Sequence, residues 1–234
     1  MNRQHVVILS ALKQHARKQR HHQTSDSYLG SGHFYHDVSV PDRRAIAKSW
    51  LKENRAIAHG EFVVVVDSLM RARSHEEKTT AAILLAYHPA GRKTVTLKKL
   101  DRWLDHLSGW AEIDSLCSNV FTAGEMLADW KDWSGFIGKL ARSKNINKCR
   151  AALVFLTGPV RYSADERLLQ LGFKIIDLVK RERDILITKA VSWLLRSLAL
   201  RHRRAVADYV ADNRAALPAI AVRETLRKIK TGRK

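Results

Sequence analysis

Phe62-Val63-Val64-Val65-Val66, continued by Asp67-Ser68-Leu69-Met70-Arg71, is the stretch that decides the fold class. Consecutive valines favour a β-strand, because β-branched side chains pack well on a pleated sheet. The run continues without a turn, however, and the rest of the chain offers no convincing strand to pair with it. A fully buried helix is therefore the preferred interpretation, and the chain is predicted to be all-α.

Helical patterns separated by short breaks lie on both sides of this run. Residues suited to first turns or caps mark several starts: Pro41 with Asp42, Ser74, Thr94 or Thr96, Ser163 and Asp184. The helix after Ser74 is expected to end before Pro89. Further helices are expected over 110–128, 132–142, 146–156, 165–180, 184–199, 203–213 and 218–230.

The composition fits an array of helix pairs. Four prolines and eleven glycines in 234 residues are few for an all-β protein, whose turns need them. Helix pairs recur roughly every 35–45 residues, in the range of HEAT-type arrays, although no repeated motif proves the period. We expect one domain over residues 1–234, an α-solenoid of antiparallel HEAT-like repeats with a concave basic face.

Net charge is the strongest functional signal. Lys and Arg number 42 against 23 Asp and Glu, a formal charge of +19 that is spread along the chain rather than held in a tail. Such an excess attracts polyanions, because each neutralised phosphate releases condensed counterions. Nucleic-acid binding is therefore predicted. A ribosomal or merely basic protein is the alternative, and no Trp-rich basic amphipathic helix favours a membrane surface.

The N-terminus and the cysteines favour an intracellular protein. The apolar run 6–9 is too short for a signal peptide or a membrane span. The first 25 residues are basic and free of acids, as in a transit peptide, but their helical pattern favours an integral first helix. Cys117 and Cys149 are too few for a disulfide framework or a zinc site. His33 and His36 have ligand-like spacing, but no second pair of ligands lies nearby, so no metal is expected. The expected location is the cytoplasm, in association with the nucleoid.

Catalytic motifs of the common kinds are absent from the sequence. It contains no Gly-rich phosphate loop, no GxSxG, no HExxH and no paired-cysteine signature. ATPase, hydrolase-fold and zinc-deaminase chemistries are therefore disfavoured, and no cofactor is expected. Single carboxylates and aromatic residues are left as the candidates for chemistry.

Three segments hold such candidates. Trp110 and Asp114 lie four residues apart, so a helix would place an electron-rich indole beside a carboxylate, which suits a cation. Trp193 lies in an apolar stripe, with Arg196 three residues on and able to reach a phosphate. Arg150 opens an apolar helix against the helix dipole, so an anionic partner is expected. Each has an ordinary alternative: a half-buried or core Trp, a solvated charge, or an acidic neighbour within the protein.

Taken in order, these segments resemble the AlkD-type DNA alkylation repair glycosylases. The resemblance rests on Tyr28-Leu29-Gly30, Val38-Ser39-Val40-Pro41-Asp42-Arg43-Arg44, Trp110 with Asp114-Ser115, Arg150-Ala151-Ala152-Leu153-Val154-Phe155, and Lys189-Ala190-Val191-Ser192-Trp193-Leu194-Leu195-Arg196. It spans roughly residues 25–215. The motifs are unspecific singly, and their order and approximate spacing carry the resemblance.

The resemblance implies excision of positively charged N3- or N7-alkylated purines from double-stranded DNA. A monomer is expected, because an asymmetric lesion in a duplex needs only one concave face, and neither a nucleotide cofactor nor a membrane is expected as a partner. Asp114 matches the catalytic carboxylate, while Trp110 and Trp193 match the aromatic pair at the sugar of the lesion. DNA contacts are implied at Arg150, Arg196, Tyr28, Arg43 and Arg44.

Two departures and two rival functions stay open. Ser197 stands where the family usually has an acid, and Ser39 replaces a longer polar residue. The first departure is expected to alter support of the Trp193 helix, and the second to weaken contacts opposite the lesion. The rivals are a non-catalytic HEAT-repeat protein that binds a DNA or RNA structure, and a HEAT-type protein scaffold, which would not need a charge of +19.

Overall fold

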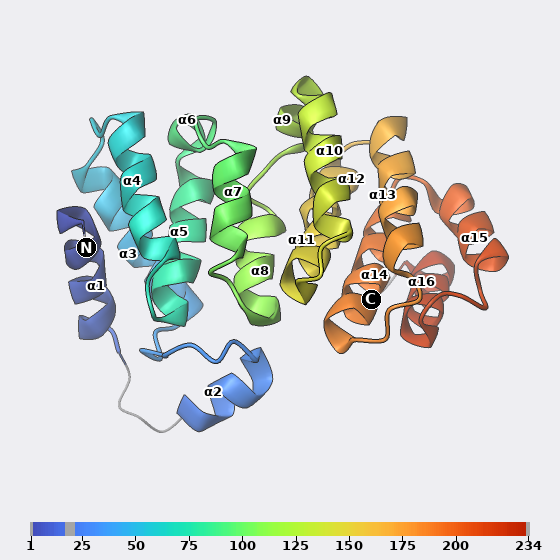
Figure 1. Cartoon of the computed structure of the whole chain (residues 1–234), viewed down its shortest axis with the longest axis horizontal. Helices are drawn as coiled ribbons and strands as arrows, with labels where there is room; N and C mark the ends of the chain where they lie inside the picture. Colours follow the sequence, from blue (N-terminus) through green and yellow to red (C-terminus); the bar gives the residue numbers. More distant parts are fainter. Residues whose placement is uncertain (1, 17–21, 233–234) are drawn as a thin grey trace. The chain divides into compact units, whose positions relative to one another are not determined.

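The computed structural model describes residues 2–16 and 22–232. All regular secondary structure among those residues is helical. The only β-type pairing among them is an isolated bridge between Phe34 and Ser74. The predicted all-α class is confirmed. The chain divides into two compact units, Met1–Leu116 and Cys117–Lys234, and each is described by itself (Figure 1).

Unit 1 contains a series of layered helices. They are α1 (Arg3–Gln14), α2 (His22–Leu29), α3 (Val40–Glu53), α4 (His59–Met70), α5 (His75–Tyr87), α6 (Pro89–Arg92), α7 (Leu97–Leu104) and α8 (Gly109–Cys117). α5 packs against both α3 and α4, and α1 packs against all three. Ile8 and Leu12 of α1 are fully buried in this packing, so α1 is an integral first helix as expected.

Unit 2 continues the pattern with α9 (Ala123–Ala128), α10 (Trp130–Ala141), α11 (Ile146–Thr157), α12 (Pro159–Tyr162), α13 (Glu166–Val179), α14 (Ile185–Leu198), α15 (Arg203–Asp212) and α16 (Ala219–Thr231). α14 packs between α11 and α16, and α10 packs on α11. Each unit thus has the layered helix pairs of an α-solenoid. An aromatic cluster of Phe121, Trp133, Phe136 and Phe155 fills part of the core of this unit.

The valine run forms the middle of α4, as predicted, but it is not fully buried. Phe62, Val65 and Val66 have no exposed surface, whereas Val64 is 52% exposed. A helix turns 100° per residue, so four adjacent side chains cannot all face one core. The expectation of a fully buried helix is therefore wrong at Val64 and correct for the rest of the run.

Most of the expected capping residues begin their helices, but the helix expected to start at Ser163 is capped by Asp165, whose carboxylate accepts from the Arg167 backbone N–H. The Ser74 hydroxyl accepts from the Glu77 backbone N–H, and Glu77 reaches back to the Ser74 N–H to complete a capping box. Thr96, rather than Thr94, caps α7. The helix expected over 110–128 is two helices, α8 and α9, because the chain breaks at 118–122 and Thr122 caps α9 with Glu125.

Candidate functional site

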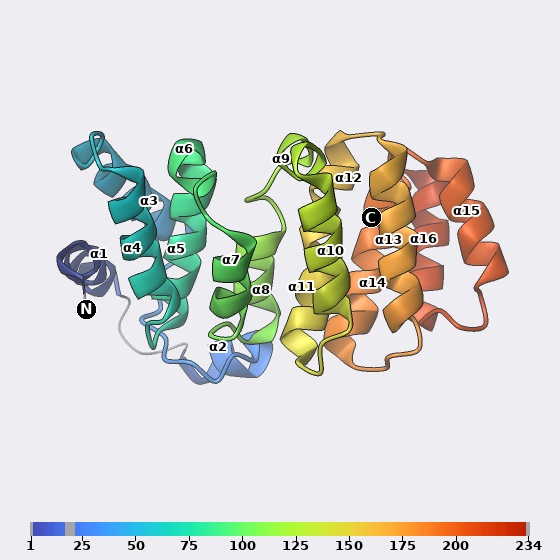
Figure 2. The same cartoon turned by 45° about the horizontal axis from the view of Figure 1, so that its top comes forward.

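The start of α8 is held against α2 by close backbone contact. Gly109 has φ 70°, in the left-handed region, and a Cβ at this position would lie 2.4 Å from the Leu29 carbonyl oxygen. Trp110 follows directly, and its indole Nε1 donates to the Tyr28 carbonyl at 2.9 Å. The Tyr28 ring meets the Trp110 ring edge-on at 5.2 Å. The two helices that carry these residues, α2 and α8, can be followed in Figure 2. α2 thus orients the indole, which sequence reasoning did not foresee.

Replacing Gly109 by alanine should loosen this contact. The left-handed conformation costs an L-residue roughly 1–2 kcal/mol, and the added Cβ would also clash with the backbone of Leu29 and Gly30. We expect faster amide hydrogen exchange in residues 26–30 and 108–114 and a lower urea midpoint. Gly135→Ala is the control, because its Cβ meets nothing within 4 Å inside α10; that change should stabilise by up to about 1 kcal/mol. Equal exchange in both variants would contradict the proposed contact.

Trp110 and Asp114 lie one helical turn apart on α8, and both side chains are partly exposed. Residues at i and i+4 share a helix face, so the indole and the carboxylate reach the same part of the surface. The sequence-based expectation that they project together agrees with this helix. A cation lying over the Trp110 indole would also be attracted electrostatically by the Asp114 carboxylate.

Glu112, between these two residues, points to the opposite side and anchors α8. It is 1% exposed and accepts from His33 Nδ1 at 2.9 Å, His75 Nδ1 at 3.2 Å and the Ser108 backbone N–H at 3.0 Å. Burial alone would raise the pKa of Glu112, but hydrogen bonds from His33 and His75 outweigh it and hold the pKa below its usual value. Glu112 is therefore a carboxylate that fixes the helix carrying Trp110 and Asp114.

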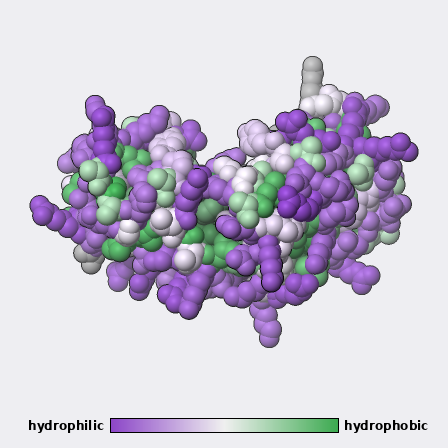
Figure 3. Space-filling model, turned by 90° about the horizontal axis from the view of Figure 1, so that it is seen from above, coloured by the Kyte–Doolittle hydropathy of each residue, from purple (hydrophilic) through white to green (hydrophobic). Residues whose placement is uncertain are grey.

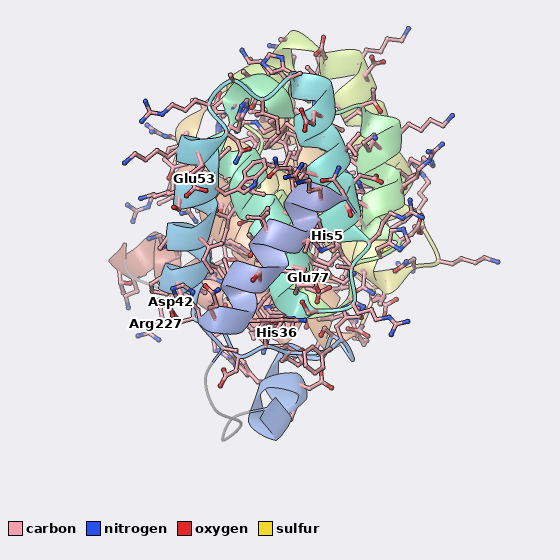
Figure 4. The ribbon with its side chains drawn as sticks, turned by 90° about the vertical axis from the view of Figure 1, so that its left-hand side faces the viewer. His5, His36, Asp42, Glu53, Glu77 and Arg227 are labelled. Atoms are coloured by element: carbon pink, nitrogen blue, oxygen red, sulfur yellow. The ribbon has the colours of Figure 1, made fainter. Side chains whose placement is uncertain are left out.

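A second buried acid ties the N-terminal helix to α5. His5 Nε2 lies 2.7 Å from Glu77 Oε1, and the two side chains meet between α1 and α5 (Figure 4). His33 bonds to Glu112, while the His36 ring packs on Phe34. Within residues 2–16 and 22–232, no group of three or more His, Cys, Asp or Glu side chains is arranged to hold a metal ion.

Arg43 and Arg44, both expected at DNA, differ in their surroundings. Arg43 is 8% exposed and donates to the Thr79 hydroxyl. Burial lowers the pKa of Arg43 despite the nearby Glu76 carboxylate. Arg44 is exposed on α3. Arg44 is thus the better placed of the two to meet a phosphate, and Arg43 supports the packing of α3 on α5.

In unit 2, three of the expected residues line one pocket of about 290 Å³. The basic pocket, as we call it, is formed by Arg150 of α11, Lys189, Trp193 and Arg196 of α14, and Ile220 and Glu224 of α16. Sequence spacing predicted that Trp193 and Arg196 share a face, and the fold adds Arg150 to them. Three cations against one carboxylate give this pocket a positive balance suited to a phosphate.

Two of the three cations of the basic pocket are held by contacts within the protein. Arg150 is 4% exposed and donates to the Leu186 backbone carbonyl at the start of α14. Arg196 Nε donates to the Ser192 carbonyl at 3.1 Å, and its Nη2 lies 3.4 Å from Glu224 Oε2. The Ser192 hydroxyl donates to the same Glu224 oxygen at 2.5 Å. Arg150 is therefore part of the packing of α11 on α14 as well as of the pocket wall.

Sequence reasoning missed Glu224. It lies 32 residues from Ser192, on a different helix, and an isolated acid on an amphipathic helix looks like any solvated charge. Only the packing of α16 on α14 reveals it. Lys189 was part of a quoted motif, but its place in the pocket also comes from the fold.

Glu224→Gln should free Arg196 and tighten binding to duplex DNA. Ion pairs near a surface are worth about 0.2–1 kcal/mol, so we expect the Kd to fall no more than roughly fivefold. The check is a fluorescence-anisotropy titration with an unmodified duplex at two salt concentrations. Asp208→Asn removes the same charge from the exposed face of α15, outside the pocket. Equal tightening in both variants would show a general charge effect rather than release of Arg196.

The structure shows the surroundings of Ser39 and Ser197, the two positions at which the sequence departs from the family pattern. Ser39 caps α3: its hydroxyl donates to the Asp42 carboxylate at 2.6 Å and accepts from the Asp42 N–H. Ser197 is 2% exposed, and its hydroxyl oxygen has no hydrogen-bond partner among the described residues. An acid at position 197 would need a buried partner. In this chain the carboxylate beside Arg196 comes from Glu224 instead.

The visible surface in the space-filling view is mainly hydrophilic. Hydrophilic side chains cover most of the face in Figure 3, and hydrophobic ones form small separate patches. No helix in the described part of the chain is both long and apolar enough to span a membrane. The layered helices and basic sites define a class, the helical-repeat proteins suited to binding a polyanion.

Comparison with known proteins identifies the family. The profile described as DNA alkylation repair enzyme matches residues 8–229, nearly the whole chain, so the protein belongs to that family. A solved structure titled "Predicted DNA alkylation repair enzyme from Enterococcus faecalis" superposes with a TM-score of 0.73 at 15% sequence identity, covering 92% of this chain and 97% of that one. It confirms the fold. No curated protein matched the sequence.

Proposed function

We propose that the protein is a DNA glycosylase of the AlkD type, which removes positively charged N3- or N7-alkylated purines from duplex DNA as a monomer inside the cell. Family membership supports a role in DNA alkylation repair. The observation that carries the finer proposal is the pairing of a fixed indole, Trp110, with the Asp114 carboxylate on one partly exposed face of α8.

The chemistry of the lesion explains why those two residues suffice for the reacting centre. Alkylation at N3 or N7 makes the purine a cation and a good leaving group. The N-glycosidic bond breaks with its electron pair passing to the purine, which becomes neutral, and the sugar acquires oxocarbenium character at C1′. Asp114 stabilises that positive charge and accepts a proton from the water that attacks C1′.

Aromatic faces add to this stabilisation. Trp110, held by the Tyr28 carbonyl, offers its ring to the developing cation through a cation–π contact worth about 0.5–2 kcal/mol. Trp193, the second aromatic residue of the proposal, lines the basic pocket of unit 2, where Lys189 and Arg196 are suited to DNA phosphates. The expected result of such a site is selection by lesion charge rather than by base shape.

The test is release of base from three duplexes of one sequence: one carrying N7-methylguanine, one carrying a neutral lesion, and one unmodified. The released base is measured by chromatography and the abasic product by strand cleavage in hot alkali, against the spontaneous loss in buffer. We expect release from the cationic lesion alone. Tight DNA binding without release from any duplex would favour the rival function, a non-catalytic binder of nucleic-acid structure.

A further inference from the structure

Unit 1 contains a second basic pocket, which the proposed reaction does not use. We call it the loop pocket. It has a volume of about 490 Å³ and opens where three connections of the chain meet: those joining α2 to α3, α4 to α5 and α7 to α8. The side chains that matter here are His33, Arg71, Arg73, Lys78, Asp105 and His106.

Positive groups dominate this lining. Of those six side chains, five are Lys, Arg or His, and the sixth is Asp105. Arg71 lies 3.6 Å from the Asp67 carboxylate, in a pair whose arginine is 64% exposed, so this pairing neutralises little of its charge. Arg73 is also exposed. The loop pocket therefore has two exposed guanidinium groups at its rim.

Lys78 gives the pocket a fixed ammonium. Its residue is only 3% exposed, and Nζ donates to the Met70 carbonyl at 3.1 Å and to the His106 carbonyl at 2.7 Å. Both acceptors are neutral, and an ammonium has three N–H donors. Burial lowers the pKa of Lys78, although Glu112 and Glu77 act in the opposite direction. An anion in the pocket would stabilise this charge.

The pKa of His106 reflects the same positive electrostatic potential. Its pKa is lowered by burial first, and then by the charges of Lys78 and Arg71, which outweigh Asp105 and Asp67. The pKa values of two titratable groups of one pocket, Lys78 and His106, are thus lowered. A bound anion would reverse the effect and favour protonation of both.

The frame of the pocket is already formed. The Phe34 N–H donates to the Arg73 carbonyl at 3.2 Å, and the His75 N–H donates to the Phe34 carbonyl at 2.9 Å, so the first two connections are joined by backbone. His33 is fixed by its bond to Glu112. A ligand would meet a preorganised site rather than a loose loop, which lowers the entropic cost of binding.

We propose that the loop pocket binds a phosphate group, supplied either by a small phosphate compound or by the backbone of a nucleic acid. Guanidinium and ammonium groups are the donors that phosphate oxygens prefer, and arginine can bind them in bidentate fashion. The site goes beyond the proposed glycosylase activity and does not involve Asp114. His106 lies four residues before Trp110 in sequence, so a bound phosphate would contact the connection from which α8 starts.

The experiment follows the His106 ring signals by NMR in the full chain, with His106→Gln used to assign them. Inorganic phosphate is titrated against chloride at constant ionic strength, and an unmodified DNA duplex is titrated in a second arm. We expect the His106 signals to move, and the midpoint of their pH titration to rise, when the ligand binds. Movement with inorganic phosphate supports a small-phosphate site, and movement with the duplex alone supports a backbone site.

The double variant Arg71→Gln/Arg73→Gln tests the pocket directly, because both residues are exposed and their replacement leaves the core intact. Hydrogen bonds to charged groups are worth about 1.5–3 kcal/mol, so the response should weaken at least tenfold. Lys93→Gln/Lys98→Gln removes the same two charges from exposed positions outside the pocket and should change it less than twofold. No movement of His106 with either ligand, or equal loss in both double variants, would overturn the proposal. Asp114→Asn should leave the response unchanged, which separates this proposal from the glycosylase one.

Discussion

Asp114→Asn should abolish release of N7-methylguanine while leaving the fold and the affinity for the duplex unchanged. Asparagine has the shape of aspartate but carries no charge and accepts no proton, so it loses both parts of the proposed role. A positioned acid or base contributes about 10²–10⁴-fold to a rate, and we expect a loss in that range under single-turnover conditions. The measurement is the rate of base release with enzyme in excess over the methylated duplex.

Duplex affinity is the readout that separates chemistry from binding. A neutral residue at position 114 removes one negative charge from a DNA-binding surface, so the Kd should stay equal or fall slightly. Asp208→Asn removes an exposed carboxylate of unit 2 as the matched control and should keep full activity. Unchanged release by Asp114→Asn would sink the assignment of the catalytic carboxylate, whatever happens to the Kd.

Local sequence patterns predicted the helices well, because caps and helical periods are properties of neighbouring residues. Ser74 with Glu77 forms the capping box that its spacing indicates, and Pro41 lies in the first turn of α3. The valine run illustrates the limit of β-propensity, since these residues form part of α4, which packs on α5. The break at 118–122 was missed because it contains no proline or glycine.

Only the parts of the candidate site that lie within a single helix could be predicted from the sequence. Trp110 with Asp114, and Trp193 with Arg196, follow from i, i+4 and i, i+3 spacing. Glu224 in the basic pocket, Tyr28 under the Trp110 indole and the burial of Arg43 all depend on contacts between separate helices. No local pattern specifies such partners, because an acid, an aromatic residue or an arginine on a helix face has the same spacing whether it is solvated or packed.

Glu112, a buried acid of unit 1, is a further residue whose partners on other segments could not be predicted from local sequence. Its replacement is the second change for which we expect a large effect. Glu112→Gln should lower the free energy of unfolding of unit 1 by roughly 3 kcal/mol, the lower end for breaking a buried charged contact. The carboxylate accepts from His33, His75 and the Ser108 N–H, whereas an amide presents an NH₂ group to donors that then lack an acceptor. Urea unfolding monitored by amide hydrogen exchange in α5 and α8 measures the change.

The pH dependence gives this prediction a second, independent readout. The pKa of Glu112 is lower in the folded protein than its usual value of 4.5, so its ionised form stabilises the fold above pH 4.5 and that contribution is lost as the pH falls toward the folded pKa. The gap between wild type and Glu112→Gln should therefore be widest near pH 7 and narrow below pH 4.5. Glu53→Gln, an exposed change on α3, should cost less than about 0.5 kcal/mol at every pH. A gap that stays constant with pH would mean that Glu112 acts through its shape alone, and that its charge does not hold α8 in place.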